Sequence, residues 1–155
     1  VEAVVSTWRE LVLEGHPLAL RFHLADVFVE EVASVDPSIS HAQFMQLAAA
    51  FEGVLVDCDD VSVLKRVVER VYMRAGEAAR RAVQQPRPDE GEETDEEELS
   101  LEERTIRAAL RLKESRLSNV DPQQLADHLF AVGADKATRA RHRKPLYAAS
   151  KALKR

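Results

Sequence analysis

Cysteine and glycine are both scarce in this chain. The one cysteine, Cys58, has no second cysteine to pair with, so an internal disulfide is excluded and a reducing compartment is expected. Five glycines do not build a phosphate-binding loop, and the glycine motifs of nucleotide-binding proteins and of serine hydrolases are missing. The five histidines are scattered without metal-ligand spacing. We therefore expect no enzyme, no cofactor, no metal site and no small-molecule substrate.

Long apolar runs and aromatic residues are also missing or rare. No apolar run approaches the length of about 18 residues that spans a bilayer, so no membrane partner is expected. Aromatic residues make up only 5% of the chain, whereas Ala, Val, Leu, Glu and Arg dominate, which favours an all-α fold over a sheet. The chain opens at Val1 inside a helical pattern and without an initiator methionine. We expect a fragment of a longer protein.

Residues 16–36 are the most apolar helical stretch of the chain. Apolar side chains cover most of the helical wheel, and such a helix is normally buried by neighbours on several sides. The pattern therefore predicts a central helix with partners on both flanks, which ends before Pro37. One narrow polar stripe runs along it, at His23, Asp26 and Glu30. We expect His23 to be half-buried.

Three further helical patterns accompany this helix, at residues 2–14, 41–56 and 60–82. Gly15 is suited to a left-handed cap after the first. Ser40 and Gln43 have the spacing of a capping box for the third. Asp59 or Asp60 caps the fourth, so we interpret the DCDD at 57–60 as a helix cap rather than a calcium loop. The second half of this helix is lined with alanine, which predicts that another element packs closely against it.

Two helical hairpins of about 40 residues each have the size of a HEAT-like or armadillo-like repeat. The resemblance is in size and pattern, and a closed four-helix bundle would give the same periodicities. We favour stacked antiparallel hairpins in a domain formed by residues 1–83.

The rest of the chain divides by charge. Residues 84–99 read as an acidic linker, and residues 100–155 as a helical C-terminal segment with a basic tail. Ten acids and no Lys or Arg fall in 89–103, whereas 136–155 holds eight Lys and Arg and no acid. The pattern predicts helices from Ser100 to about 116, from Asp121 to Gly133, and again from about Pro145. The acidic stretch could also fold over the basic tail and mask it.

The basic tail is the best candidate for a contact with RNA or a comparably acidic partner, because no acid within it neutralises its charge. Its candidate RNA-binding residues are Arg139, Arg141, Arg143, Lys144, Lys151, Lys154 and Arg155. A second candidate is a basic ridge on two helix faces, formed by Arg66, Arg70, Arg74, Arg104, Arg107 and Arg111. The simpler interpretation of the ridge is a solvated helix face with local pairs such as Glu77 with Arg81.

Four segments together resemble a known family. They are RFHLADVFVEEVASV at 21–35, DDVSVLKRVVERVY at 59–72, VDPQQLADHLFAVG at 120–133 and TRARHRKPLYAASKALKR at 138–155. Their order and spacing resemble the ribosomal RNA processing protein 1 family of nucleolar proteins. The first match is carried by Arg21, Phe22, His23, Leu24, Asp26, Phe28 and Glu31, and the later one by Leu129, Phe130, Arg139, Arg143, Lys144, Leu146 and Tyr147. The family's N-terminal half is absent, and Pro145 stands where the family continues an unbroken helix.

The resemblance implies a non-enzymatic nucleolar factor that helps to assemble the large ribosomal subunit. It implies an α-helical scaffold within pre-ribosomal particles, needed for processing of the precursor rRNA. Its expected partners are other large-subunit assembly factors and the phosphate backbone of precursor rRNA. The alternative is an armadillo-like adaptor that binds proteins only.

Overall fold

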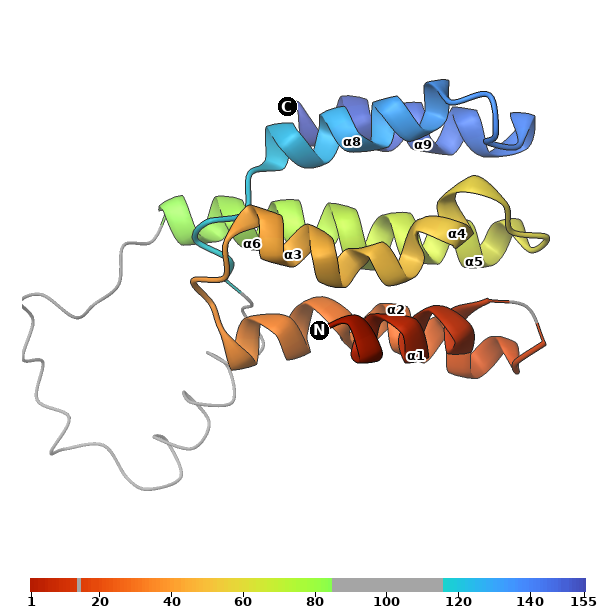
Figure 1. The fold of residues 1–155 in the computed structure, drawn as a ribbon. Helices are drawn as coiled ribbons and strands as arrows, with labels where there is room; N and C mark the ends of the chain where they lie inside the picture. The colour runs from red at the N-terminus through yellow and green to blue at the C-terminus, as the bar shows by residue number, and fades with distance from the viewer. Residues whose placement is uncertain (14, 85–115) are drawn as a thin grey trace, which may run out of the picture.

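The computed structural model describes residues 1–13, 15–84 and 116–155. All regular structure in these ranges is helical, and the helices pack as antiparallel pairs in three layers (Figure 1). The predicted all-α fold is confirmed. Whether the stacked hairpins belong to the HEAT or armadillo type stays a prediction.

The first layer consists of α1 (Glu2–Val12) and α2 (Leu18–Val35). The turn between them contains Gly15 at a φ of +96°, the left-handed conformation that the sequence predicts there. Val12 is fully buried, and its carbonyl oxygen accepts a hydrogen bond of 2.7 Å from Arg21 Nε on α2. This bond ties the end of the first helix to the start of the second.

The middle layer consists of two continuous helical rods with irregular turns inside them. The first contains α3 (His41–Ala48), the 3₁₀ turn η1 (Ala49–Phe51) and α4 (Glu52–Val56), and the second contains α5 (Val61–Val67), the π-helical η2 (Val68–Met73) and α6 (Arg74–Gln84). Both predicted caps are confirmed: Ser40 and Gln43 form the capping box, and Asp60 accepts from the Ser62 amide at 2.8 Å.

The third layer consists of α8 (Pro122–Ala134) and α9 (Ala140–Leu153). Asp121 caps α8 by accepting from the amides of Gln123 and Gln124, as predicted. The last helix begins at Ala140 and contains Pro145 in its interior, so the predicted start at Pro145 is wrong. The earlier turn persists because the contacts of Arg139 and His142 with the middle layer fix it, as described below.

Aromatic rings join the first layer to the second. Phe28 of α2 lies edge-to-face against Phe44, Phe51 and Trp8, with ring centroids 5.8, 5.0 and 5.7 Å apart. Phe44 and Phe51 are fully buried. Such pairs contribute about 0.5–1.5 kcal/mol each beyond the area that they bury, so this cluster anchors α1 and α2 on the middle layer.

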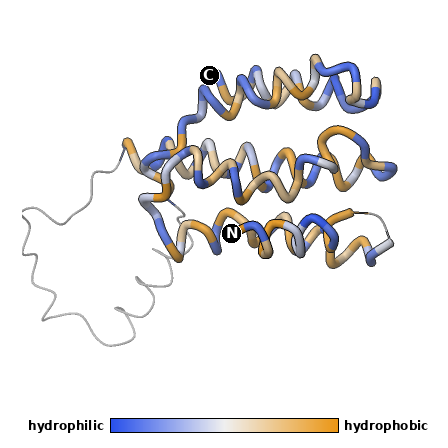
Figure 2. The backbone as a smooth tube through the Cα atoms, viewed as in Figure 1, coloured by the Kyte–Doolittle hydropathy of each residue, from blue (hydrophilic) through white to orange (hydrophobic). Residues whose placement is uncertain are grey.

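The prediction that residues 16–36 form the central helix is wrong. The middle layer, residues 41–84, contacts both other layers, whereas α2 lies in an outer layer and leaves part of its apolar surface uncovered. Val35 is 84% exposed and Leu18 41% exposed, and His23 is exposed rather than half-buried. Figure 2 shows the hydrophobic stretches along this outer layer.

The third layer is docked on the first four helices. Leu117 is buried, and its amide donates to Ala78 O at 3.3 Å. The Ser118 amide donates to Pro37 O at 3.0 Å, and Asn119 Nδ2 to Ser38 O at 2.7 Å. The acidic linker and nearly all of the predicted helix from Ser100 lie outside the described residues, so the division at residue 84 stays a prediction.

Candidate nucleic-acid interface

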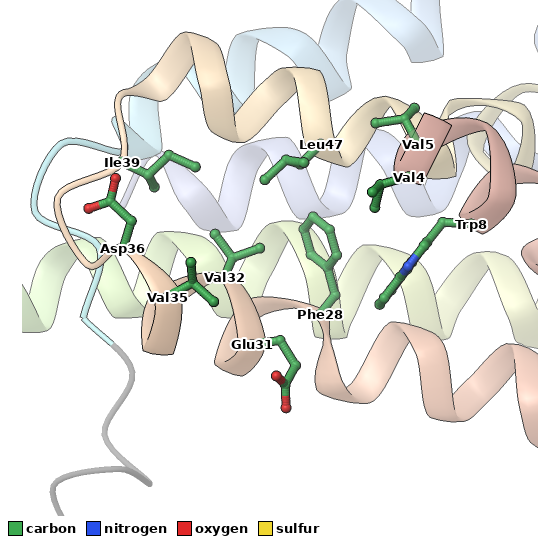
Figure 3. A pocket seen from close by; sticks show the side chains of 10 residues that line it. All are labelled: Val4, Val5, Trp8, Phe28, Glu31, Val32, Val35, Asp36, Ile39 and Leu47. Carbon is green, nitrogen blue, oxygen red and sulfur yellow. The ribbon is translucent and has the colours of Figure 1, made fainter. Parts of the chain in front are cut away.

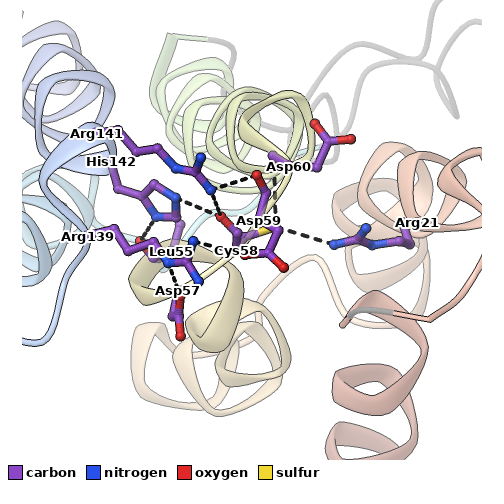
Figure 4. Close-up of polar contacts among 9 residues, drawn as sticks. All are labelled: Arg21, Leu55, Asp57, Cys58, Asp59, Asp60, Arg139, Arg141 and His142. Carbon is purple, nitrogen blue, oxygen red and sulfur yellow. Dashed lines mark hydrogen bonds and ion pairs between the residues drawn. The ribbon is translucent and has the colours of Figure 1, made fainter.

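Arg139 lies at the start of α9 and binds the loop that joins α4 to α5 (Figure 4). Its Nε bonds Asp57, its Nη1 lies 2.9 Å from Asp59 Oδ1, and its amide donates to Val56 O at 3.0 Å. The hydrogen bond to Asp57 is the main cause that raises the pKa of Arg139, so its guanidinium stays charged. This predicted RNA contact is already paired within the chain.

Arg141 and His142 bind the same loop through its backbone. Arg141 Nη2 donates to Cys58 O at 2.9 Å and to Asp59 O at 2.6 Å. His142 is fully buried, and its two ring nitrogens lie 2.9 and 3.0 Å from the carbonyl oxygens of Leu55 and Cys58 (Figure 4). The start of α9 is therefore a clamp on residues 55–60, and no pattern in the sequence predicts a buried histidine here.

Arg143 is directed to the turn between α8 and α9. Its Nη2 donates to the carbonyl oxygens of Asp135 and Thr138 at 3.3 and 3.4 Å. The carbonyls beyond a helix end lack intrahelical donors, and a guanidinium satisfies them. The three arginines at positions 139, 141 and 143 thus bond to the chain itself.

The remaining four candidates lie on the outer side of α9 and just beyond its end at Leu153. Lys144, Lys151 and Arg155 are exposed, and no side-chain hydrogen bond or ion pair joins them to other described residues. Lys154 pairs with Asp127 of α8 at 3.1 Å and remains exposed. The structure therefore separates the basic tail into three arginines that bond to other parts of the chain, Arg139, Arg141 and Arg143, and an outer face that is open to a partner.

The first half of the predicted basic ridge faces α2. Arg66 and Arg70 each lie 3.5 Å from Asp26 Oδ1, and Arg74 lies 2.8 Å from Glu30 Oε1. The polar stripe of α2 is thus the partner of these arginines. The local pair of Glu77 with Arg81 is present, at 3.8 Å. Arg104, Arg107 and Arg111 lie outside the described residues.

Sequence reasoning missed an apolar groove between α1, α2 and α3 (Figure 3). It has a volume of about 230 Å³, and eight of its ten lining residues are apolar. Glu31 and Asp36 are the two exceptions. Residues lining it are Val4, Val5, Trp8, Phe28, Val32, Val35, Ile39 and Leu47. The high exposure of Val35 follows from its position on this groove.

Another missed feature is a cluster of ionisable side chains between α4, η2 and α8. His128 Nε2 lies 2.5 Å from Glu52 Oε1, and the Tyr72 hydroxyl donates to the same carboxylate at 3.4 Å. Burial is the main cause that raises the pKa of Tyr72 well above its usual value, so Tyr72 acts as a hydrogen-bond donor. The cluster joins the second layer to the third.

Within residues 1–13, 15–84 and 116–155, no three His, Cys, Asp or Glu side chains lie together as metal ligands would. None of the helices described there is long and apolar enough to cross a membrane. The open basic face of α9 is thus the feature with the clearest chemistry, because it suits a phosphate backbone.

Comparison with known proteins decides the family. The family model described as the nucleolar protein Nop52 matches residues 1–149. The chain belongs to this family. Neither a curated protein nor a solved structure matches it.

Membership of the Nop52 family confirms part of what the sequence predicts. It supports a role in nucleolar ribosome biogenesis, and it confirms the nucleolus as the expected location. The Nop52 family is not a known enzyme family. Kinship with ribosomal RNA processing protein 1 in particular remains a proposal.

Proposed function

We propose that this member of the Nop52 family is a non-catalytic scaffold of large-subunit pre-ribosomal particles and is needed for precursor rRNA processing. The proposal includes its kinship with the ribosomal RNA processing protein 1 family. In this proposal the docked helical hairpins bind neighbouring assembly factors, and the outer face of α9 binds the rRNA backbone. The family match over residues 1–149 supports the setting.

The observation that carries the RNA contact is the unpaired charge on α9. Lys144 and Lys151 lie seven residues apart and so share one face of α9, and Arg155 follows four residues later, just beyond the end of the helix. All three are exposed, and within the described part of the chain no carboxylate pairs with them. Phosphate contacts of such side chains release condensed counterions and give affinity without sequence readout.

The test is binding of a large-subunit precursor RNA segment across a salt series. The variant Lys144→Glu/Lys151→Glu reverses two charges on this face, and Arg9→Glu/Lys65→Glu reverses two exposed charges on α1 and α5. We expect the wild type and the control variant to lose affinity log-linearly with salt. The α9 variant should bind more weakly, with a slope smaller by about one unit per lost contact.

The apolar groove favours a second candidate, the adaptor that binds proteins only. Contiguous exposed apolar surface commonly marks a protein interaction site. The same salt series separates the two candidates. If the RNA does not bind, or if both double variants bind it as the wild type does, the RNA contact is wrong and the adaptor is the better description.

A further inference from the structure

Two exposed aromatic rings lie side by side on the outer surface of the third layer. Phe130 of α8 is 53% exposed and Tyr147 of α9 is 37% exposed. Their ring centroids are 5.2 Å apart, with an angle of 43° between the ring planes. Exposed neighbouring aromatics are uncommon on a surface that has no partner, because each leaves apolar area in water.

The backbone of α8 holds the tyrosine ring in place. Gly133 has no side chain, and a Cβ built on it would lie 2.8 Å from Cε1 and 3.2 Å from Cδ1 of Tyr147. The ring therefore rests directly on the helix backbone at a position where any other residue would displace it. Lys154 Nζ lies 5.9 Å from the ring centroid of Phe130, at the outer limit of a cation–π contact. The two rings thus lie together, with a cation beside them.

Lysines flank the rings along α9. Lys144 precedes Tyr147 by three residues, Lys151 follows it by four and Lys154 by seven, so all three share its side of the helix. Lys154 also pairs with Asp127. Within the described residues, no other carboxylate bonds to any of the three lysines. Around the two rings, positive charge thus exceeds negative charge.

We propose that Phe130 and Tyr147 form a stacking platform for unpaired bases of single-stranded RNA, with Lys144, Lys151 and Lys154 at the adjoining phosphates. This inference rests on the proposed RNA contact and names the form of RNA that the face accepts. Exposed aromatic rings beside cations are an arrangement that many proteins use to bind single strands. A duplex hides the faces of its bases, so it can meet the lysines but not the rings.

The test uses the full chain and two RNA probes of equal length, a single-stranded oligouridine and a duplex. The variant Phe130→Leu/Tyr147→Leu keeps apolar side chains at both positions and removes both π faces. The conservative variant Phe130→Tyr/Tyr147→Phe keeps them. Binding is followed by fluorescence anisotropy at several salt concentrations, and far-UV circular dichroism verifies that each variant remains helical.

We expect the leucine variant to bind the single strand about tenfold more weakly than the wild type, with an unchanged salt slope. The conservative variant should bind as the wild type does, and the duplex should bind more weakly than the single strand. These three results together support the platform.

Two other outcomes overturn it in distinguishable ways. If Lys144→Glu/Lys151→Glu weakens binding while the leucine variant binds normally, the phosphate contact stands and the stacking platform is wrong. If the wild type binds neither probe, the RNA contact and the platform fail together. In that case the aromatic pair is a candidate protein contact, which loss of a protein partner in the leucine variant would show.

Discussion

Among the polar side chains of α9, that of His142 is the most deeply buried. It is fully buried, and each of its ring nitrogens faces a carbonyl oxygen, one from Leu55 and one from Cys58. The two carbonyls belong to the end of α4 and to the loop before α5. A neutral imidazole carries one N–H, so in that form it donates to one of these carbonyls at a time.

Replacing this ring with an apolar side chain should be costly. We expect His142→Leu to lower the free energy of unfolding by about 1–3 kcal/mol, because the Leu55 carbonyl loses a polar partner, whereas the Cys58 carbonyl keeps Arg141. Urea denaturation followed by circular dichroism measures the change. The matched control is His23→Leu on the exposed side of α2, which should stay within about 0.5 kcal/mol of the wild type. Equal effects of the two substitutions would contradict the clamp.

His41 gives the protein a pH dependence with a definite sign. Its Nδ1 accepts from the Asp121 amide at 3.2 Å, which joins the start of α3 to the start of α8. Burial is the main cause that lowers the pKa of His41; His128 lowers it further, and Asp121 opposes the shift. The unfolded chain therefore takes up this proton at a higher pH than the folded chain does.

The free energy of unfolding should accordingly decrease as the pH falls below about 6.5, the ordinary pKa of histidine, because the unfolded chain is protonated first. Urea midpoints measured from pH 7.5 to pH 5 should fall for the wild type. The fall should be smaller in His41→Asn, which has no group to protonate. His23→Asn should retain the dependence of the wild type. If removing His41 leaves the pH profile unaltered, its neutral form is not what stabilises the fold.

At the scale of the element, Gly76 explains how closely α9 approaches α6. From the sequence alone, this glycine is a weak point in a long helix, because glycine has a low helix propensity. The alanines around it predict close packing. Ala75 and Ala78 are fully buried, and a Cβ built on Gly76 would lie 2.4 Å from Cδ2 of Leu153. The close neighbours that the alanines predict are thus α8, which packs along α6, and Leu153 at the end of α9.

Gly76→Ala should therefore destabilise the protein despite the higher helix propensity of alanine. Alanine gains up to about 1 kcal/mol in an open helix, whereas overpacking a core costs about 1–3 kcal/mol. We expect a net loss of stability in urea denaturation. Shortening the neighbour in Gly76→Ala/Leu153→Val should recover part of it. A stabilised single variant would show that Leu153 moves aside freely.

Local signals in the sequence predict the helix ends well. Ser40 with Gln43, Asp60 and Asp121 each bond amides two or three residues away, so a short stretch of sequence contains both partners. The predicted start of α9, at Pro145, is too late because the signals for its true start are not local. The contacts that support its first turn come from Val56 and Leu55, more than 80 residues earlier.

The candidate site could be predicted only in part, for the same reason. Composition identifies the basic tail, but it does not tell which cations have partners. Arg139 bonds Asp57, which lies 82 residues away in the sequence. Helical periodicity likewise shows that residues 16–36 are apolar, but not that the polar stripe with Asp26 faces Arg66 and Arg70. Long-range pairing decides these points.

At the scale of the whole molecule, the third layer is held by two kinds of contact. Exposed ion pairs, such as Arg139 with Asp59, contribute about 0–1 kcal/mol each. Buried side chains contribute more, since fully burying a leucine is worth about 1.5–3 kcal/mol, and Leu117, Leu125 and Leu146 are fully buried. Apolar packing should therefore dominate the attachment of residues 117–155 to the rest.

Cutting the chain tests this attachment. A protease site inserted after Gly91 lies in the predicted acidic linker, outside the described residues. After cleavage we expect the two pieces to elute together in size-exclusion chromatography. Raising the salt concentration should not separate them, because apolar packing is not screened as exposed ion pairs are.

Two variants compare the contribution of the ion pairs with that of apolar packing. Asp57→Asn/Asp59→Asn removes both carboxylates that pair with Arg139, and it should weaken the association of the cut pieces only slightly. Leu125→Ala leaves a cavity in a fully buried site and should weaken it by about 2–5 kcal/mol. If the cut wild-type pieces separate and each stays helical, residues 117–155 form an independent unit, and the predicted division of the chain describes it better than a single stack of three layers.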